Sequence, residues 1–114
     1  MKKLELARRE NGQAIVIDVV GELTAGSDYE RLTEMVRQAV GAGTRLVLIN
    51  LKQCRRVDSS GIGELVTCLV TATRQDARLR LTDVPQPILG IMKITNVLKA
   101  FEVFTTEDEA LAGA

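Results

Sequence analysis

The sequence predicts an α/β domain with a mixed, mostly parallel sheet of four to five strands covered by helices. Apolar, strand-like segments alternate along the chain with segments whose apolar residues fall at helical spacing. This alternation is typical of parallel sheets built from right-handed crossovers. The run Leu-Val-Leu-Ile at 46–49 is apolar throughout, as expected for a strand that helices bury on both faces. Asn11 and Gly12 form a strong hairpin signal, which adds an antiparallel strand and makes the predicted sheet mixed.

The predicted strands are short and mostly apolar. The second is rich in β-branched residues and is expected to be buried, with Gly21 at its end. The fourth alternates apolar and charged residues, which predicts one wetter face. The five predicted strands are residues 4–7, 14–20, 45–51, 77–81 and 101–104.

Two long helices are predicted in the first two thirds of the chain. Thr24 or Ser27 is expected to cap a helix that runs to about Val40 and stops at the Gly-Ala-Gly run 41–43. A second helix follows the third strand and runs to about Gln75.

Two shorter helices are predicted toward the C-terminal end. Asp83 and Pro85 open the first of them, and the Thr-Asn pair at 95–96 breaks it. The run Thr-Glu-Asp-Glu at 106–109 is a capping box for a terminal helix. The residues of the third helix expected to face inward are Ile88, Ile91 and Met92.

Length and composition exclude several classes of function. A chain of 114 residues is expected to form one domain, residues 1–114. Its 15 basic and 15 acidic residues cancel, and it has one Tyr, two Phe and no Trp. It therefore lacks the charge and the stacking surface of a nucleic-acid binder. No apolar run approaches the ~20 residues of a membrane helix, and the N-terminus does not read as a signal peptide. A cytoplasmic protein without membrane contact is expected.

The chain contains no histidine, which removes histidine-based nucleophile pairs, metal sites and pH switches. Cys54 and Cys68 are too few for a disulfide framework and lack metal-ligand spacing. Both are expected to be ordinary buried or half-buried thiols. Neither a metal nor a cofactor is expected.

The most informative stretch is Asp58-Ser59-Ser60-Gly61, which lies between the third strand and the second helix. It places two hydroxyls and a carboxylate at the first turn of a helix. There, free backbone N–H groups point outward and the helix dipole favours negative charge. A serine at this position can be an ordinary N-cap, or it can be a place for a phosphate group. The residues alone leave both interpretations open.

Segments 20–23 (Val-Gly-Glu-Leu), 46–51 and 57–63, the last with its Asp-Ser-Ser-Gly motif, occur in the order found in the STAS domain. The chain resembles that family, and in particular the small free-standing anti-sigma-factor antagonists of bacteria. Residues 88–101 also resemble the family's third helix and the turn after it. The resemblance covers nearly the whole chain.

The resemblance implies partner switching without enzymatic activity. The unmodified antagonist binds an anti-sigma factor that is also a serine kinase, which frees the sigma factor. The kinase phosphorylates the serine after the motif aspartate, and a serine phosphatase reverses this. Carried over, Ser59 is the acceptor, and Asp58, Ser60 and Gly61 shape its turn. Thr24 stands where the family often has an acidic residue, in a loop expected near the acceptor. A monomer or weak dimer is expected.

Several alternatives stay open at this point. Gly61 and Gly63 are expected either to pack closely against a neighbouring loop or to leave room for a partner. Glu22 is either structural or a partner contact. Arg55 and Arg56 are either solvated loop charges or groups that bind a partner's carboxylate or phosphate.

Two rival functions also follow from the motif. One is a non-catalytic scaffold subunit of a larger signalling assembly. The other is a small serine hydrolase that uses Ser59 or Ser60 with Asp58. The lack of a histidine or an obvious lysine base near the serines disfavours the hydrolase.

Overall fold

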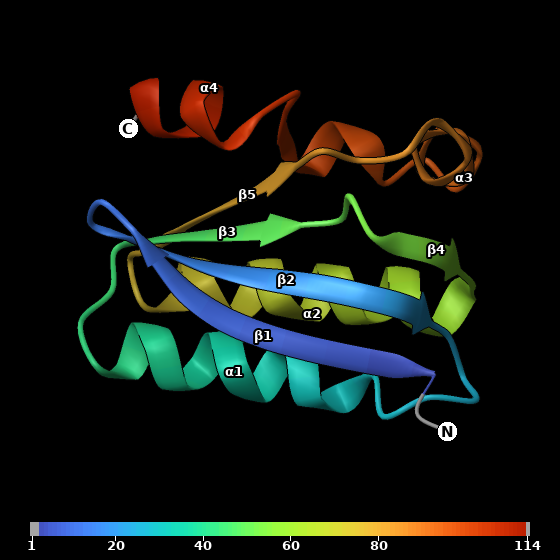
Figure 1. Ribbon diagram of the computed structural model, residues 1–114, viewed down its shortest axis with the longest axis horizontal. Helices are drawn as coiled ribbons and strands as arrows, with labels where there is room; N and C mark the ends of the chain where they lie inside the picture. Colours follow the sequence, from blue (N-terminus) through green and yellow to red (C-terminus); the bar gives the residue numbers. More distant parts are fainter. Residues whose placement is uncertain (1–2, 114) are drawn as a thin grey trace.

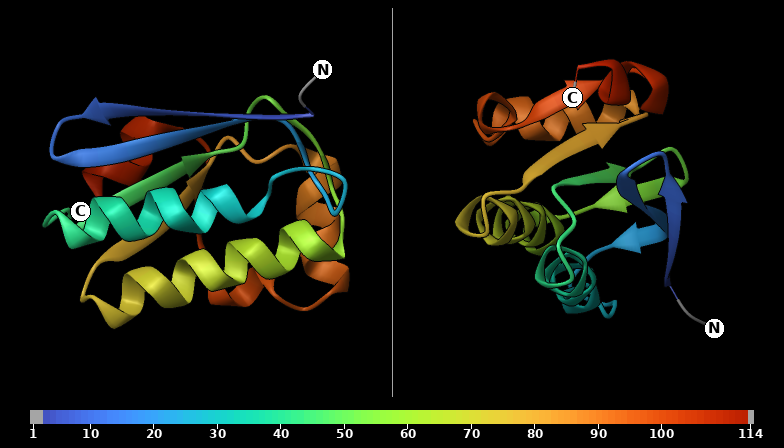
Figure 2. Two further views of the ribbon diagram at one scale, coloured as in Figure 1. Left: turned by 90° about the horizontal axis from the view of Figure 1, so that it is seen from below. Right: turned by 90° about the vertical axis from the view of Figure 1, so that its left-hand side faces the viewer.

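The computed structural model describes residues 3–113, which form one mixed sheet with helices on both faces (Figure 1). The two long helices cover one face of the sheet, and the C-terminal helix lies on the other (Figure 2). The strands are β1 (Leu4–Asn11), β2 (Ala14–Leu23), β3 (Leu46–Asn50), β4 (Cys54–Val57), β5 (Arg78–Thr82) and β6 (Glu102–Phe104). The helices are α1 (Glu30–Gly41), α2 (Ser59–Arg74), α3 (Gln86–Ile94) and α4 (Glu107–Ala112), with a 3-10 turn η1 (Leu98–Ala100).

The predicted fold class is confirmed by the pairing of the strands. β1 and β2 form an antiparallel hairpin in which Asn11 pairs with Ala14, and Gly12 takes the left-handed conformation at its tip. The other pairs, β2–β3, β2–β4, β3–β5 and β5–β6, are parallel. The order is β1-β2-β3-β5-β6, with β4 pairing with β2 beyond the end of β3.

The sequence analysis predicted that Gly21 ends the second strand, and this prediction is wrong. β2 continues to Leu23, with a bulge between Gly21 and Glu22. The backbone of Gly21 has φ of 104°, and a Cβ there would lie 2.1 Å from the carbonyl oxygen of Lys3. Only glycine allows this approach. The bulge redirects β2, and the last residues of β2 pair with β4. β4 is an additional short strand that the sequence analysis did not predict.

The start of α1 also differs from the prediction. Neither Thr24 nor Ser27 caps it, because α1 begins at Glu30 with Tyr29 at the N-cap and no side-chain cap bond. The Ser27 hydroxyl donates instead to the carbonyl oxygen of Thr24 at 2.7 Å. Residues 24–27 therefore close a separate turn, which their own hydrogen bonds satisfy.

The other predicted helix ends are confirmed. α1, α2 and α3 each end before a residue with positive φ: Gly43, Asp76 and Asn96, respectively. Pro85 precedes α3 as its N-cap residue. The Thr106 hydroxyl accepts from the Glu109 N–H at the start of α4, as in a capping box.

The core lies mainly between the sheet and helices α1 and α2. Alternate residues of the central strands, such as Ile17, Ile49 and Leu81, are fully buried against these helices. The opposite residues form a smaller cluster under α4, around Val16 and Leu48. The inward residues of α3 are as predicted, with Ile88 and Met92 buried and Ile91 half-buried. Cys54 and Cys68 are buried free thiols, as predicted, and burial raises the pKa of Cys68 to about 12. Within residues 3–113, none of the helices combines the length and the apolar composition needed to cross a bilayer.

Glu64 of α2 caps α1 from across the interface between the two helices. Only 7% of Glu64 is exposed, and its carboxylate accepts from the backbone N–H of Thr33 at 2.9 Å and from the Thr33 hydroxyl. The carboxylate therefore satisfies a donor near the start of α1 that has no side-chain cap of its own.

Glu64→Ala is expected to lower the free energy of unfolding by about 2 kcal/mol. It removes the carboxylate that accepts from both the N–H and the hydroxyl of the buried Thr33, and it leaves the hydroxyl only its contact with the Cys68 sulfur at 3.5 Å. Glu64→Gln keeps an acceptor oxygen and is expected to cost less than half as much. Urea unfolding of the two variants tests this. A loss below about 0.5 kcal/mol for Glu64→Ala would show that the contact does not stabilise the fold.

Candidate functional site

Asp58 joins two segments that lie far apart in the sequence. It is the N-cap residue of α2, and its Oδ1 accepts from the Gly61 N–H at 3.1 Å. Its Oδ2 accepts from the Ala25 N–H at 2.9 Å. The 24–27 turn after β2 and the first turn of α2 are therefore held side by side. Ser59, the first residue of α2, is exposed, and Ser60 is half-buried.

The hydrogen bond from the Ala25 N–H, together with those from the first turn of α2, lowers the pKa of Asp58 below its usual value, against the opposing effect of partial burial. The carboxylate is thus ionised at neutral pH and already accepts two backbone N–H groups. The lowered pKa and the two occupied oxygens make it a weak general base for Ser59 or Ser60, and they favour a structural role.

Gly61 and Gly63 differ in their surroundings. A Cβ at Gly61 would lie 1.9 Å from the carbonyl oxygen of Leu23, so this glycine allows the start of α2 to touch the end of β2. Close packing, against the end of strand β2 and not against a loop, therefore accounts for the glycine at position 61. A Cβ at Gly63 would meet no atom within 4 Å, and this residue is exposed. Packing therefore does not explain the glycine at position 63.

The other candidate residues lie around the same end of β2. Glu22 is half-buried, and it is paired with Arg56 in the register of β2 and β4. Thr24 is only 7% exposed, so its side chain offers little surface to a partner, whereas Ala25 is exposed. Arg55 and Arg56 are exposed but belong to strand β4, not to a loop.

The outer face of α2 carries no exposed charge until its last residue. The Thr67 hydroxyl donates to the Gly63 carbonyl at 2.9 Å and so bonds within the helix. A phosphate on Ser59 would therefore add charge to a helix face whose exposed residues are uncharged before Arg74. The exposed residues of α2 are Ser59, Gly63, Thr67, Val70, Thr73 and Arg74.

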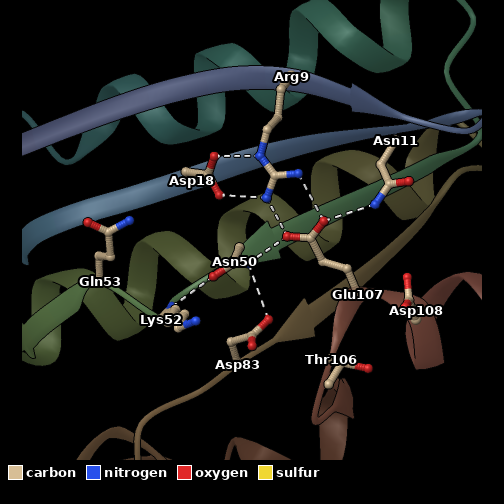
Figure 3. Close-up of a pocket in the computed structure, with 10 residues that line it drawn as sticks. All are labelled: Arg9, Asn11, Asp18, Asn50, Lys52, Gln53, Asp83, Thr106, Glu107 and Asp108. Carbon is tan, nitrogen blue, oxygen red and sulfur yellow. Dashed lines mark hydrogen bonds and ion pairs between the residues drawn. The ribbon is translucent and has the colours of Figure 1, made fainter.

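A second polar region lies on the opposite face of the sheet, in a hollow of about 500 Å³. Figure 3 shows Glu107 of α4 at its centre, between Arg9, Asn11 and Asn50. Glu107 accepts from both amides, at 3.0 Å and 2.6 Å, and from the guanidinium of Arg9, which also binds Asp18. Because these groups satisfy one another, the network fixes α4 to the sheet and leaves no evident ligand site. The sequence analysis did not single out these residues.

The stabilisation that this network gives the fold is expected to be lost at acid pH. Arg9 and the two amides lower the pKa of Glu107 from 4.5 to about 2, against the opposing effect of burial. A lowered pKa stabilises the fold at pH values above 4.5, and that stabilisation is lost as the pH falls toward 2. At pH 7, Glu107→Gln is expected to cost about 1–2 kcal/mol, allowing for solvent screening of the exposed Arg9.

Urea unfolding at several pH values between 7 and 2 tests this prediction. The difference between the parent and Glu107→Gln should shrink as the pH falls. Asp108→Asn, which removes an exposed carboxylate from the same helical turn, is the matched control and should show a smaller difference at every pH. A constant difference for Glu107→Gln would contradict the assigned ionisation.

The sequence profile of the STAS domain matches residues 5–110, nearly the whole chain. The chain belongs to the STAS domain family. Solved STAS structures share its fold. An anti-sigma factor antagonist from Mycobacterium paratuberculosis is 18% identical with a TM-score of 0.81, covering 96% of this chain and 92% of that protein. A STAS domain anti-sigma-factor antagonist from Planctomyces limnophilus is 22% identical with a TM-score of 0.80, covering 95% and 96%.

A third similar structure is the Bacillus cell fate determinant SpoIIAA in its phosphorylated form. It is 17% identical with a TM-score of 0.69, covering 97% of this chain and 99% of that protein. At these identities the likeness shows that the STAS fold is shared. The predicted fold and family are confirmed, and the roles of the individual site residues stay predictions.

Proposed function

We propose that this STAS chain is an anti-sigma-factor antagonist that acts by partner switching. The unmodified chain binds an anti-sigma factor that is also a serine kinase, and so frees a sigma factor. Phosphorylation of Ser59 abolishes this binding, and a serine phosphatase restores it. The observation that carries the proposal is an exposed serine at the start of α2, on a helix face whose exposed residues carry no charge before Arg74. The similar structures named as anti-sigma factor antagonists support it.

A phosphate on Ser59 would act on the partner and not on the fold. It carries about −1.5 to −2 charges at pH 7. At the N-terminus of a helix this charge is tolerated or mildly stabilising, because it faces the positive end of the helix dipole. In an interface shaped for a neutral hydroxyl, the same charge loses its hydration and does not fit, and it is repelled where the partner carries a like charge. The expected result is loss of binding without unfolding.

The proposed contact surface is the first turn of α2, the exposed face of α2 and the segment from Gly21 to Ser27. The hydrogen bond from the Ala25 N–H to Asp58 holds the 21–27 segment against the first turn of α2. One partner can therefore contact both segments. Gly63 leaves the surface open beside Ser59. Within these segments, the half-buried Ser60 and Glu22 and the buried Thr24 would support the surface from below. We place the protein in the cytoplasm, as a monomer or a weak dimer.

Phosphate mapping tests the acceptor. The kinase-like anti-sigma factors encoded in the source genome would each be incubated with the chain and ATP. The γ-phosphoryl group of ATP should pass to the Ser59 hydroxyl, releasing ADP and the hydroxyl proton, and mass spectrometry should find one phosphate. Ser59→Ala should take up none, and the matched control Ser60→Ala should be labelled like the parent. Phosphate on Ser60, or full labelling of Ser59→Ala, would contradict the assignment.

A further inference from the structure

We propose that the end of α3 and the turn after it form a second binding surface, which takes an acidic segment of a protein partner that carries an apolar side chain. This surface, called the α3–η1 surface, does not depend on Ser59. It consists of Lys93, Ile94, Asn96, Leu98 and Lys99.

Ile94 is unusually exposed for a large apolar side chain. It is 86% exposed, and the other exposed large apolar side chain among residues 3–113 is Val70, at 41%. α3 packs Ile88 and Met92 inward. Ile94 follows Met92 by two residues and therefore lies on the opposite side of the helix. One exposed apolar residue is ordinary by itself, so its surroundings decide what it indicates.

A hollow of about 300 Å³ lies at the same end of α3. Lys93, Asn96, Leu98 and Lys99 line it. Leu98 is half-buried and both lysines are exposed. The alkyl stems of lysine can form an apolar wall while the ammonium groups stay in water at the rim. The hollow thus combines an apolar lining with a basic rim, and it has the size for a side chain.

The charge at this rim is not balanced within the described residues. In residues 3–113, no ion pair joins Lys93 or Lys99 to a carboxylate, and no carboxylate lines the hollow. Arg9 and Arg80, in contrast, each pair with an acidic side chain. Complementary charge gives an interface its specificity and its rate of association, so two unpaired lysines beside an apolar hollow indicate an acidic partner.

The turn after α3 holds these groups in a fixed arrangement. The Val97 N–H donates to the Met92 carbonyl at 3.0 Å, and the Asn96 N–H donates to the Lys93 carbonyl at 3.1 Å. With φ of 61° at Asn96, these two bonds form a Schellman motif. A preformed surface loses less entropy on binding than a mobile one.

Other occupants fit the α3–η1 surface less well. Lipid-binding segments usually gather four to eight basic residues, and this surface has two. A second copy of the chain would have to present exposed acidic residues beside an exposed apolar one. Apart from Ile94, the exposed large apolar side chain among residues 3–113 is Val70, and the exposed charge on its helix is the basic Arg74, so Val70 does not provide such a segment. A partner with glutamate or aspartate around a leucine-sized side chain matches both the rim and the hollow.

The test uses the full chain labelled with 15N and a synthetic peptide of glutamate and leucine at helical spacing. NMR titration should perturb the amides of the α3–η1 surface, and added salt should weaken binding. The double variant Lys93→Glu/Lys99→Glu should bind at least about tenfold more weakly, since it reverses both charges. Ile94→Ser should also weaken binding. Lys52→Glu, which reverses an exposed lysine outside this surface, should bind like the parent.

Several outcomes would overturn the proposal. These are perturbation of other residues only, equal binding by the double variant, and equal binding of a peptide with lysine in place of glutamate. Binding to phosphatidylserine vesicles without binding to the acidic peptide would assign the surface to a membrane instead. A dimer in sedimentation velocity that Ile94→Ser abolishes would assign it to contact between copies. All the substituted residues are exposed, so the variants should melt like the parent, and circular dichroism checks this.

Discussion

Replacement of Ser59 by aspartate is expected to weaken binding to the anti-sigma factor by about tenfold, and phosphorylation by about a hundredfold or more. Both changes place negative charge at the centre of the proposed contact surface. Phosphate brings more charge and more acceptor oxygens than aspartate, so its effect is larger. Ser59→Ala should bind like the unmodified chain and remain in the binding state, because it cannot accept phosphate. Calorimetric titration with the purified anti-sigma factor measures all of these affinities.

The control for net charge is Gln38→Glu, which adds one negative charge at an exposed position of α1 outside the proposed surface. It should bind like the parent. All the variants should melt within a few degrees of one another, because the N-terminus of α2 accepts negative charge. Tight binding by Ser59→Asp would rule out an electrostatic switch. Loss of binding that comes from unfolding of Ser59→Asp would rule out a switch at the interface.

The same substitution at two neighbouring glycines of α2 is expected to have opposite effects on stability. Gly61→Ala should lower the free energy of unfolding by about 2–3 kcal/mol, because its Cβ would overlap the backbone of Leu23 and force the strand and the helix apart. Gly63→Ala should raise it by up to about 1 kcal/mol, because alanine favours the helix and its Cβ meets no neighbour.

Urea unfolding of both variants, with equal m-values as the check for two-state behaviour, tests the pair. Each variant is the control for the other, since both add one methyl group to the first turns of α2. A loss of stability in Gly63→Ala as large as that in Gly61→Ala would show that the start of α2 is not packed as described.

The helices and strands whose buried residues follow a regular pattern along the chain could be predicted from the sequence. The β2 and β3 segments are apolar over several consecutive residues, and α2 has a clear helical spacing of apolar residues. The sequence also indicated a cap at this turn, and in the structure Asp58 is the N-cap residue. The STAS family match confirms the resemblance that pointed to Asp58–Gly61, although Ser59 as the phosphate acceptor stays a prediction.

The features that were missed depend on contacts between distant segments. β4 has four residues, two of them exposed arginines, so no periodic pattern marks it as a strand. Gly21 takes a positive φ at a bulge within β2, whereas a glycine after a run of apolar residues is more simply interpreted as the end of a strand. The bond from Ala25 to Asp58 uses a backbone N–H, which has no signature in a sequence. Glu64 looks like an exposed helical residue until α1 is packed beside it.

One reversible titration tests the partner-switching proposal most directly. The unmodified chain is titrated into its anti-sigma factor, then the same preparation is titrated after stoichiometric phosphorylation of Ser59 and again after treatment with a serine phosphatase. The proposal predicts tight binding, then binding at least about a hundredfold weaker, then full recovery. An affinity that stays the same through all three steps, with phosphate confirmed on Ser59, would contradict it.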